Sequence, residues 1–271
     1  MTRQEQQALF AENGFLVIQN ILTSAELAEC HGEICRLHEL AIDLEANGDP
    51  ARSHFQHEPY ARDRMHNDLP VLRKIENTRL HSEIFRNLAA HPPLIQTVQN
   101  LLGKDLLLFR STLMLKPAHH GSAHALHQDS SYWPMKPPSL VTASIALNQA
   151  TPENGCFKVI PGSHKWGLKE WGNIATQQDE AIANREDIDL SGQIDISLEA
   201  GSALLFHSLL VHGSGPNRSP LPRNTALYAY FSPHVNYAPK AGAPREKSFP
   251  VVAGLDGALE HTLVARSVDS T

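Results

Sequence analysis

His127 and Asp129 are the first residues of this 271-residue chain whose types and spacing could bind a metal ion. They lie two apart in Ala-Leu-His-Gln-Asp-Ser-Ser-Tyr-Trp, and residues i and i+2 of an extended chain point to the same face. Both side chains can therefore reach one ion. Because the chain holds 16 histidines, one His-x-Asp pair is a weak signal until a third ligand joins it.

The third ligand is best sought between Ala203 and Asn217, where His207 and His212 compete. Their odd spacing places them on opposite faces of one continuous strand, so at most one looks into a barrel beside the first two ligands. His212 stands just before a Gly-Ser-Gly-Pro turn, at the expected strand end, where side chains at the mouth of a small barrel converge. His212 is therefore favoured.

Two histidines and one carboxylate form the facial triad typical of non-haem Fe(II), which leaves positions open for a co-substrate and dioxygen. An open zinc site with the same ligands is a physical alternative. Arg223 follows at the start of the next expected strand, across a turn rich in Gly, Pro and Asn. An inward guanidinium there could clamp the far carboxylate of a chelating co-substrate, and the alternative is a surface arginine.

Composition excludes several classes of function. The formal net charge of −6, without a Lys/Arg cluster, argues against nucleic-acid binding. The polar N-terminus and the lack of a run of about 18 apolar residues argue against a signal peptide and a membrane span, so a cytoplasmic location is expected. Three cysteines without a Cys-x-x-Cys pair predict neither a disulfide framework nor a thiolate zinc site.

The first part of the chain reads as helical. Thr23 and Glu26 fit a capping box ahead of an apolar period of helical spacing, which predicts a helix to about Glu45. Two shorter helices are expected, one around 82–90 and one from Pro92 or Pro93 to Leu102 with Gly103 behind it. Residues 51–70 are polar without a clear period and are interpreted as a loop or lid.

From Leu106 onward, short apolar runs between Pro, Gly, Asn and Ser clusters predict an all-β sandwich or barrel. The expected strands cover 106–116, 140–148, 157–160, 203–211 and 224–232, and a polar insertion covers 166–199. We expect a single domain with a helical layer over 1–105, a β core over 106–233 and a tail over 234–271.

Motifs along most of the chain, from about Leu9 to Pro233, resemble the phytanoyl-CoA dioxygenase family of Fe(II)/2-oxoglutarate oxygenases. The residues that carry the resemblance occur in family order: Glu12–Leu27, His91–Gly103, His127-Gln-Asp with Tyr132-Trp-Pro, Asn154–His164, and His212-Gly-Ser-Gly-Pro-Asn with Arg223.

The resemblance implies a mainly β fold with N-terminal helices, the double-stranded β-helix or jelly roll of cupin type. It implies Fe(II) bound by His127, Asp129 and His212, and 2-oxoglutarate bound through its distal carboxylate by Arg223 with help from Ser214. Gln128 points the other way in an ideal strand, yet the family places it near the co-substrate.

The activity implied is oxidation by dioxygen with release of succinate and CO2, most simply hydroxylation of an aliphatic carbon. Related halogenases replace the carboxylate ligand with a small residue, so Asp129 favours hydroxylation or a variant such as desaturation or demethylation. Two alternatives lie outside this class: a zinc-dependent hydrolase with the same ligands, and a jelly-roll binding protein that has lost turnover.

The substrate leaves few traces in the sequence. Tyr132, Trp133 and Lys158 are candidate pocket residues, although an aromatic beside a strand is often a core residue. His124 stands an odd step from His127 and should face away from the metal in a regular strand. No basic cluster that would suit the phosphates of a coenzyme A thioester is evident, which favours a smaller metabolite or natural-product intermediate. Oligomeric state has no visible signal.

Overall fold

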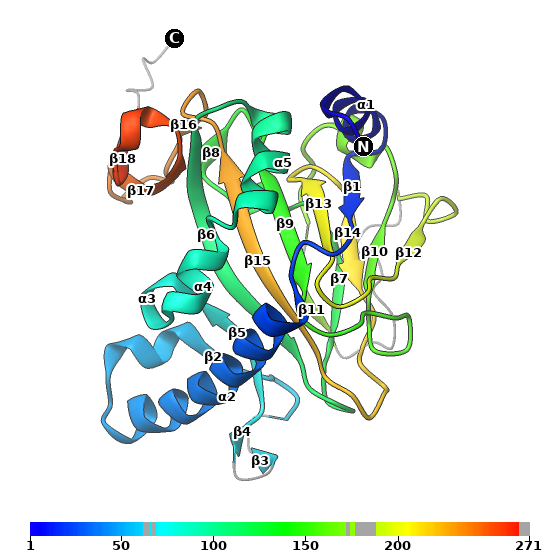
Figure 1. The fold of residues 1–271 in the computed structure, drawn as a ribbon, viewed down its shortest axis with the longest axis vertical. Helices are drawn as coiled ribbons and strands as arrows, with labels where there is room; N and C mark the ends of the chain where they lie inside the picture. The colour runs from blue at the N-terminus through cyan, green and yellow to red at the C-terminus, as the bar shows by residue number, and fades with distance from the viewer. Residues whose placement is uncertain (62–64, 67–68, 172–173, 177–187, 266–271) are drawn as a thin grey trace.

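Two antiparallel sheets that face each other form the body of the protein, in the expected double-stranded β-helix (Figure 1). The structure, a computed structural model, describes residues 1–61, 65–66, 69–171, 174–176 and 188–265. The larger sheet has the order β1 (Phe15–Ile18), β13 (Ala203–His207), β9 (Val141–Ala146), β15 (Arg223–Phe231), β6 (Leu106–Lys116), β17 (Glu246–Ala253), β18 (Glu260–Val264). Its β6 also pairs with β5 (Leu72–Glu76), which pairs with β2 (Phe55–His57). The smaller sheet has the order β11 (Ala175–Thr176), β7 (Ala123–His127), β14 (His212–Ser214), β10 (Phe157–Val159), β12 (Ile194–Ile196).

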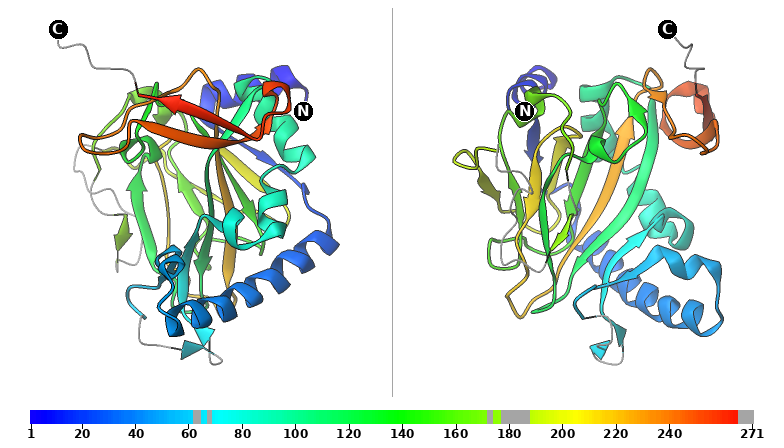
Figure 2. Two further views of the ribbon diagram at one scale, coloured as in Figure 1. Left: turned by 90° about the vertical axis from the view of Figure 1, so that its left-hand side faces the viewer. Right: turned by 180° about the vertical axis from the view of Figure 1, so that it is seen from behind.

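Helices cover the outer face of the larger sheet (Figure 1, Figure 2). They are α1 (Arg3–Asn13), α2 (Ser24–Ala46), α3 (Thr78–His81), α4 (Glu83–Leu88) and α5 (Pro92–Leu102). The predicted capping box of α2 is present, with the Thr23 side chain accepting from the Glu26 N–H and the Glu26 carboxylate accepting from the Thr23 N–H. Gly103 ends α5 with a φ of 101°.

Side chains along the central strands point alternately to the helices on the outer face of the sheet and to the interior of the barrel. On β15, Tyr228 and Tyr230 point to the helices, where their hydroxyls donate to the backbone oxygens of Phe85 and Ala89. Leu227 and Ala229, on the other face, line the cavity between the sheets. Because side chains alternate with a period of two, one face of each central strand packs against the helices and the other face lines the cavity.

Most predicted elements are confirmed by the structure, but several segments differ, and the expected helical layer over 1–105 also contains β1 and β5 of the larger sheet. Residues 51–70 are not simply a loop, because β2 lies within them and extends the larger sheet. The predicted strand over 203–211 is two strands, since the chain leaves the larger sheet after β13 and enters the smaller sheet at β14. The tail contributes β17 and β18, and part of the expected insertion, 172–173 and 177–187, lies outside the described residues.

Within the described part of the chain, none of the helices has the length and apolar character needed to cross a bilayer. The organisation as a single domain stays a prediction.

Candidate active site

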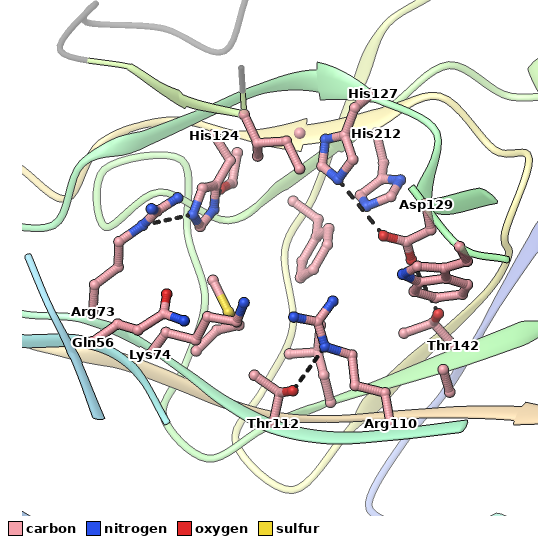
Figure 3. A pocket seen from close by; sticks show the side chains of 18 of the residues that line it. Gln56, Arg73, Lys74, Arg110, Thr112, His124, His127, Asp129, Thr142 and His212 are labelled. Carbon is pink, nitrogen blue, oxygen red and sulfur yellow. Dashed lines mark hydrogen bonds and ion pairs between the residues drawn. The ribbon is translucent and has the colours of Figure 1, made fainter. Parts of the chain in front are cut away.

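The structure brings His127, Asp129 and His212 together at one end of the cavity (Figure 3). His127 ends β7 and His212 begins β14, and the two residues are direct partners across this strand pair. Asp129 follows at the start of a short 3-10 helix (Asp129–Ser131). One ligand atom from each residue lies within 4.8 Å of the others, so a single ion can contact all three.

The hydrogen bonds of the two imidazoles leave the correct nitrogen free for a metal. Nδ1 of His127 donates to the Ala125 carbonyl at 2.9 Å, and Nδ1 of His212 donates to the Leu210 carbonyl at 3.0 Å, because a carbonyl can only accept. Each Nε2 therefore keeps its lone pair, as in metal sites where the second ring nitrogen is fixed by a backbone oxygen. Burial, reinforced by His127, lowers the pKa of His212 to about 4, so this ligand is neutral at neutral pH.

Asp129 meets the requirement for an anionic ligand. Burial alone would raise the pKa of its carboxyl, but the nearby His127, His212 and Arg110 outweigh burial and leave the pKa below its ordinary value. Its Oδ1 lies 3.7 Å from Nε2 of His127, too far for a hydrogen bond but suited to two ligands of one ion. Its Oδ2 accepts from the Thr142 hydroxyl at 3.2 Å, which fixes the carboxylate plane.

We expect Thr142→Val to weaken Fe(II) binding about 10-fold, because partners that orient a metal ligand typically contribute 10–100-fold in affinity. The measurement is anaerobic Fe(II) titration. The matched control is Ser144→Ala on the same strand, whose buried hydroxyl makes no hydrogen bond with the described residues and whose loss should leave the affinity unchanged. Equal affinities for wild type and Thr142→Val would show that Thr142 does not orient the ligand.

His207 lies apart from the group of His127, Asp129 and His212, and not for the reason that the sequence suggested. The prediction placed His207 and His212 on opposite faces of one strand, whereas they lie on different strands of different sheets. The His207 ring packs against His164 and Phe10, beside the N-terminal helix.

The cavity between the sheets has a volume of about 220 Å³, and its two walls differ in chemistry. The smaller sheet supplies His127 and His212 of the candidate metal site, together with Phe157, His124 and Ser214. The larger sheet supplies most of the cationic side chains. Its residues on the cavity wall are Gln56, Arg73, Lys74, Arg110, Thr112, Met114, Thr142, Arg223, Leu227 and Ala229.

Arg223 lies inside this cavity and is not a surface arginine, since only 2% of it is exposed. Nε and Nη2 donate to the Gly155 carbonyl at 3.1 and 2.5 Å, and Nη1 donates to the Thr225 hydroxyl at 3.4 Å. Burial lowers the pKa of Arg223 to about 10, so it remains a cation at neutral pH. Gly155 has a φ of 81°, and a Cβ there would overlap the Gly215 carbonyl oxygen, so the turn that holds Arg223 requires glycine.

His124 contradicts the prediction that it faces away. Ser214 pairs with His124 and His212 with His127, so β7 uses one residue more than β14 between these two pairs. This β-bulge returns His124 to the cavity side, where it contacts Ser214 and Arg73.

Arg73 enters the cavity by a second bulge, because His57 pairs with Leu72 and Gln56 with Lys74. Its Nε donates to Nε2 of His124 at 3.2 Å (Figure 3). Arg73, Lys74 and Arg110 carried no recognisable motif in the sequence, and alternation within an irregular segment could not have found Arg73.

Gln128 is not among the described residues that line the cavity, and its contact with the co-substrate stays a prediction. Its amide nitrogen donates to the carbonyls of Gly167 and Leu209, and its oxygen accepts from the Lys169 N–H and the Trp171 indole. Gln128 therefore binds the chain that follows β10. This agrees with the alternation of side chains in a strand, which points Gln128 away from the side of His127 and Asp129.

The three substrate candidates have different positions. Trp133 lines the cavity. Tyr132 is 41% exposed, with its ring edge toward His127 at 6.1 Å between centroids, and it is absent from the described cavity wall. Lys158 is also absent from that wall because its neighbour Phe157 occupies the inward position on β10, and its ammonium pairs with Asp195 at 3.2 Å.

The sequence profile described as Phytanoyl-CoA dioxygenase (PhyH) matches residues 10–225, most of the chain. The protein belongs to the phytanoyl-CoA dioxygenase family. The human protein "Phytanoyl-CoA dioxygenase, peroxisomal" is 27% identical over 263 residues, which cover 93% of this chain and 75% of that protein. "Ectoine dioxygenase" of Nocardia farcinica is 27% identical over 244 residues, which cover 84% of this chain and 77% of that protein.

Solved structures of this family's architecture superpose on the chain. The apo form of the non-heme monooxygenase ThoJ matches with a TM-score of 0.72 and 26% identity, over 93% of this chain and 84% of that one. EctD from S. alaskensis, solved with 2-oxoglutarate and 5-hydroxyectoine, matches with a TM-score of 0.67 and 24% identity, over 90% of this chain and 82% of that one.

The predicted jelly-roll fold is confirmed. As a phytanoyl-CoA dioxygenase family member, the protein is an oxygenase of the Fe(II)/2-oxoglutarate class, and its His–Asp–His group is consistent with that use.

Proposed function

We propose that the protein hydroxylates an aliphatic carbon of a small metabolite, with Fe(II) held by His127, Asp129 and His212 and with 2-oxoglutarate held through its distal carboxylate by Arg223. The observation that carries this proposal is the placement of a buried arginine and a three-ligand metal site on the walls of one cavity. A zinc hydrolase would have no need of the buried guanidinium.

Phe157 relates the arginine to the metal ligands. Its ring centroid lies 5.4 Å from the guanidinium carbon of Arg223 and 5.9 Å from the ring centroid of His212. One aromatic ring therefore separates the cation from a ligand, a span suited to a short dicarboxylate that reaches from the ion to Arg223. Phe157 also keeps this part of the cavity apolar, which strengthens the ion pair with the distal carboxylate.

When bound, Fe(II) and 2-oxoglutarate supply the oxidising chemistry, in which dioxygen is consumed, succinate and CO2 are released, and a substrate C–H bond is hydroxylated. The chain's own residues position and shield these reactants. Thr142 holds the Asp129 carboxylate, backbone carbonyls hold the two imidazoles, and Gly155 holds Arg223. Because Asp129 is present, no ligand position is vacated for a halide, which favours hydroxylation; desaturation and demethylation are variants of the same site.

A hydrogen-bond relay aims the Ser214 hydroxyl at the co-substrate. Arg73 can only donate, so Nε2 of His124 must accept and its proton resides on Nδ1. Burial, with Lys116 and Arg73 nearby, lowers the pKa of His124 well below its ordinary value, so the ring is neutral. Nδ1 then donates to the Ser214 oxygen at 3.3 Å, which leaves the hydroxyl hydrogen of Ser214 for a carboxylate beside Arg223.

We expect Ser214→Ala to weaken 2-oxoglutarate binding about 10-fold, the typical worth of a hydrogen bond to a charged group. His124→Phe should weaken it less, because the hydroxyl is misoriented but present. The double variant should bind no more weakly than Ser214→Ala alone, since both changes act through one hydroxyl. Anaerobic binding titrations measure all three, and additive losses would contradict the relay.

The test of the proposed function is succinate release from 2-oxoglutarate under air with Fe(II) and ascorbate, with and without a panel of small aliphatic metabolites. We expect slow succinate release alone and faster release with hydroxylated product when a substrate is present. Release with Fe(II) but not with Zn(II) separates the oxygenase from the hydrolase. Absence of succinate release across the whole panel would favour the non-catalytic binding protein and contradict the proposal.

A cytoplasmic location stays a prediction.

A further inference from the structure

Arg110 offers a second anion-binding group in the cavity, separate from Arg223. It lies on β6, and its guanidinium points into the cavity from the wall opposite His127 (Figure 3). Its Nε donates to the Thr112 hydroxyl at 3.0 Å, and its Nη2 donates to Glu76 at 2.7 Å. Nη1 makes no hydrogen bond with another described residue, so its two N–H groups are available to a ligand.

The charge of Arg110 is only partly balanced. Glu76 is shared, because the same Oε1 atom also accepts from Lys74 at 2.5 Å. One carboxylate thus serves two cations that line the cavity. Arg110 also lines the same cavity as Asp129, and Figure 3 shows both side chains directed into it.

The excess of positive charge persists after the co-substrate binds. Arg73, Lys74, Arg110 and Arg223 face three carboxylates: Asp129 and Glu76, described above, and the buried Glu58 near Arg73. Fe(II) and the dianion of 2-oxoglutarate cancel each other's formal charge. With Arg223 occupied by the distal carboxylate, the cavity keeps one positive charge, and Arg110, whose guanidinium points into the cavity in Figure 3, has free donors there.

A neighbouring hollow shares Arg110, Thr112 and Trp133 with the main cavity and adds Phe109, Glu76 and Asn77. Phe109 and Trp133 pack with ring centroids 4.9 Å apart, so an apolar surface adjoins the guanidinium. A ligand whose anionic group binds Arg110 can lay its carbon skeleton along this aromatic pair and still approach the metal ligands.

We propose that the substrate of this oxygenase bears an oxyanion, a carboxylate or a phosphate ester, which the Nη1 group of Arg110 binds while Trp133 contacts the adjoining carbon chain. This inference rests on the proposed function, because it assigns Arg223 to 2-oxoglutarate and leaves Arg110 to the substrate. It also gives an acidic protein, whose sequence has no Lys/Arg cluster, a local positive site inside the cavity.

The test uses hexanoate, hexyl phosphate and the uncharged hexanamide as probes, titrated calorimetrically and anaerobically into protein saturated with Fe(II) and 2-oxoglutarate. We expect at least one anion to bind wild type about 10-fold more tightly than hexanamide, the scale of a charge-assisted pair in a partly desolvated site. The stronger of the two anions identifies the carboxylate or the phosphate ester as the recognised group.

Arg110→Gln should reduce the ratio of anion to amide affinity to about one, while Arg110→Lys, which keeps the charge but loses the planar fork, should give an intermediate ratio. Arg52→Gln is the matched control, because it removes the same charge from an exposed arginine outside the cavity and should keep the wild-type ratio. Melting temperature and 2-oxoglutarate affinity of each variant report whether its fold and co-substrate site are intact.

The outcomes separate this inference from the proposed function. If wild type does not bind 2-oxoglutarate, the proposed function fails and the inference fails with it. If 2-oxoglutarate binds but no anion exceeds hexanamide, or if Arg110→Gln keeps the anion preference, only the assignment of Arg110 is overturned.

Discussion

Asp129→Ala should abolish substrate oxidation, with kcat/KM reduced by more than about 100-fold, because even residues that merely orient a ligand contribute 10–100-fold. Asp129 is the anionic member of the group and, through Thr142, the one whose orientation the larger sheet controls. The measurement is product formation and succinate release under air with Fe(II) and 2-oxoglutarate. Fe(II) affinity, titrated anaerobically, should fall in parallel.

Asp195→Ala is the matched control for this variant. It removes a carboxylate that is 39% exposed and pairs with Lys158 outside the described cavity wall, so activity should be unchanged. Normal hydroxylation by Asp129→Ala would contradict the ligand assignment. Loss of activity in both variants would trace the effect to folding.

Replacing Arg223 by Gln should weaken 2-oxoglutarate binding about 100-fold. Removing one partner of a buried charge pair costs 2–5 kcal/mol, and each 1.4 kcal/mol is tenfold in affinity. Arg223→Lys should recover part of the loss, because it keeps the charge without the two-pronged geometry. The measurement is an anaerobic 2-oxoglutarate titration of the metal-loaded protein, and metal affinity should be unchanged because Arg223 is not among the proposed ligands.

Arg218→Gln is the control for this change. It removes the same charge from an exposed residue in the turn between β14 and Arg223, and it should leave the affinity for 2-oxoglutarate unchanged. Melting temperatures complete the comparison, since Arg223→Gln also removes two donors from the Gly155 carbonyl. Wild-type affinity for 2-oxoglutarate in Arg223→Gln, with an intact fold, would remove Arg223 from the co-substrate site.

The group of His127, Asp129 and His212 could be predicted from the sequence because these residues follow local rules. His127 and Asp129 are close in the chain, and His212 precedes a turn whose Gly and Pro residues are visible in the sequence. The route from His207 to His212 was not predictable in the same way. Reading the faces of residues from odd or even spacing assumes one continuous strand, whereas the chain changes sheets between these two residues.

The wall opposite the metal was missed for two physical reasons. Arg73 and His124 reach the cavity through β-bulges, and a bulge shifts side-chain alternation by one residue without a clear mark in the sequence. Lys74 on β5 and Arg110 on β6 each flank a shift of pairing register, and their place on the cavity wall also depends on which strands pair across the sheet. Long-range pairing of this kind is a property of the fold, so the basic character of the cavity appears only in three dimensions.

The most direct measurement is a crystal structure of the protein with Mn(II) in place of Fe(II) and with 2-oxoglutarate, grown without oxygen. Mn(II) suits the same nitrogen and carboxylate ligands. We expect Nε2 of His127, Nε2 of His212 and a carboxylate oxygen of Asp129 on the ion, with the distal carboxylate of 2-oxoglutarate on Arg223 and Ser214. A metal bound by other residues, or a co-substrate whose distal carboxylate lies on Arg110 instead of Arg223, would contradict the account.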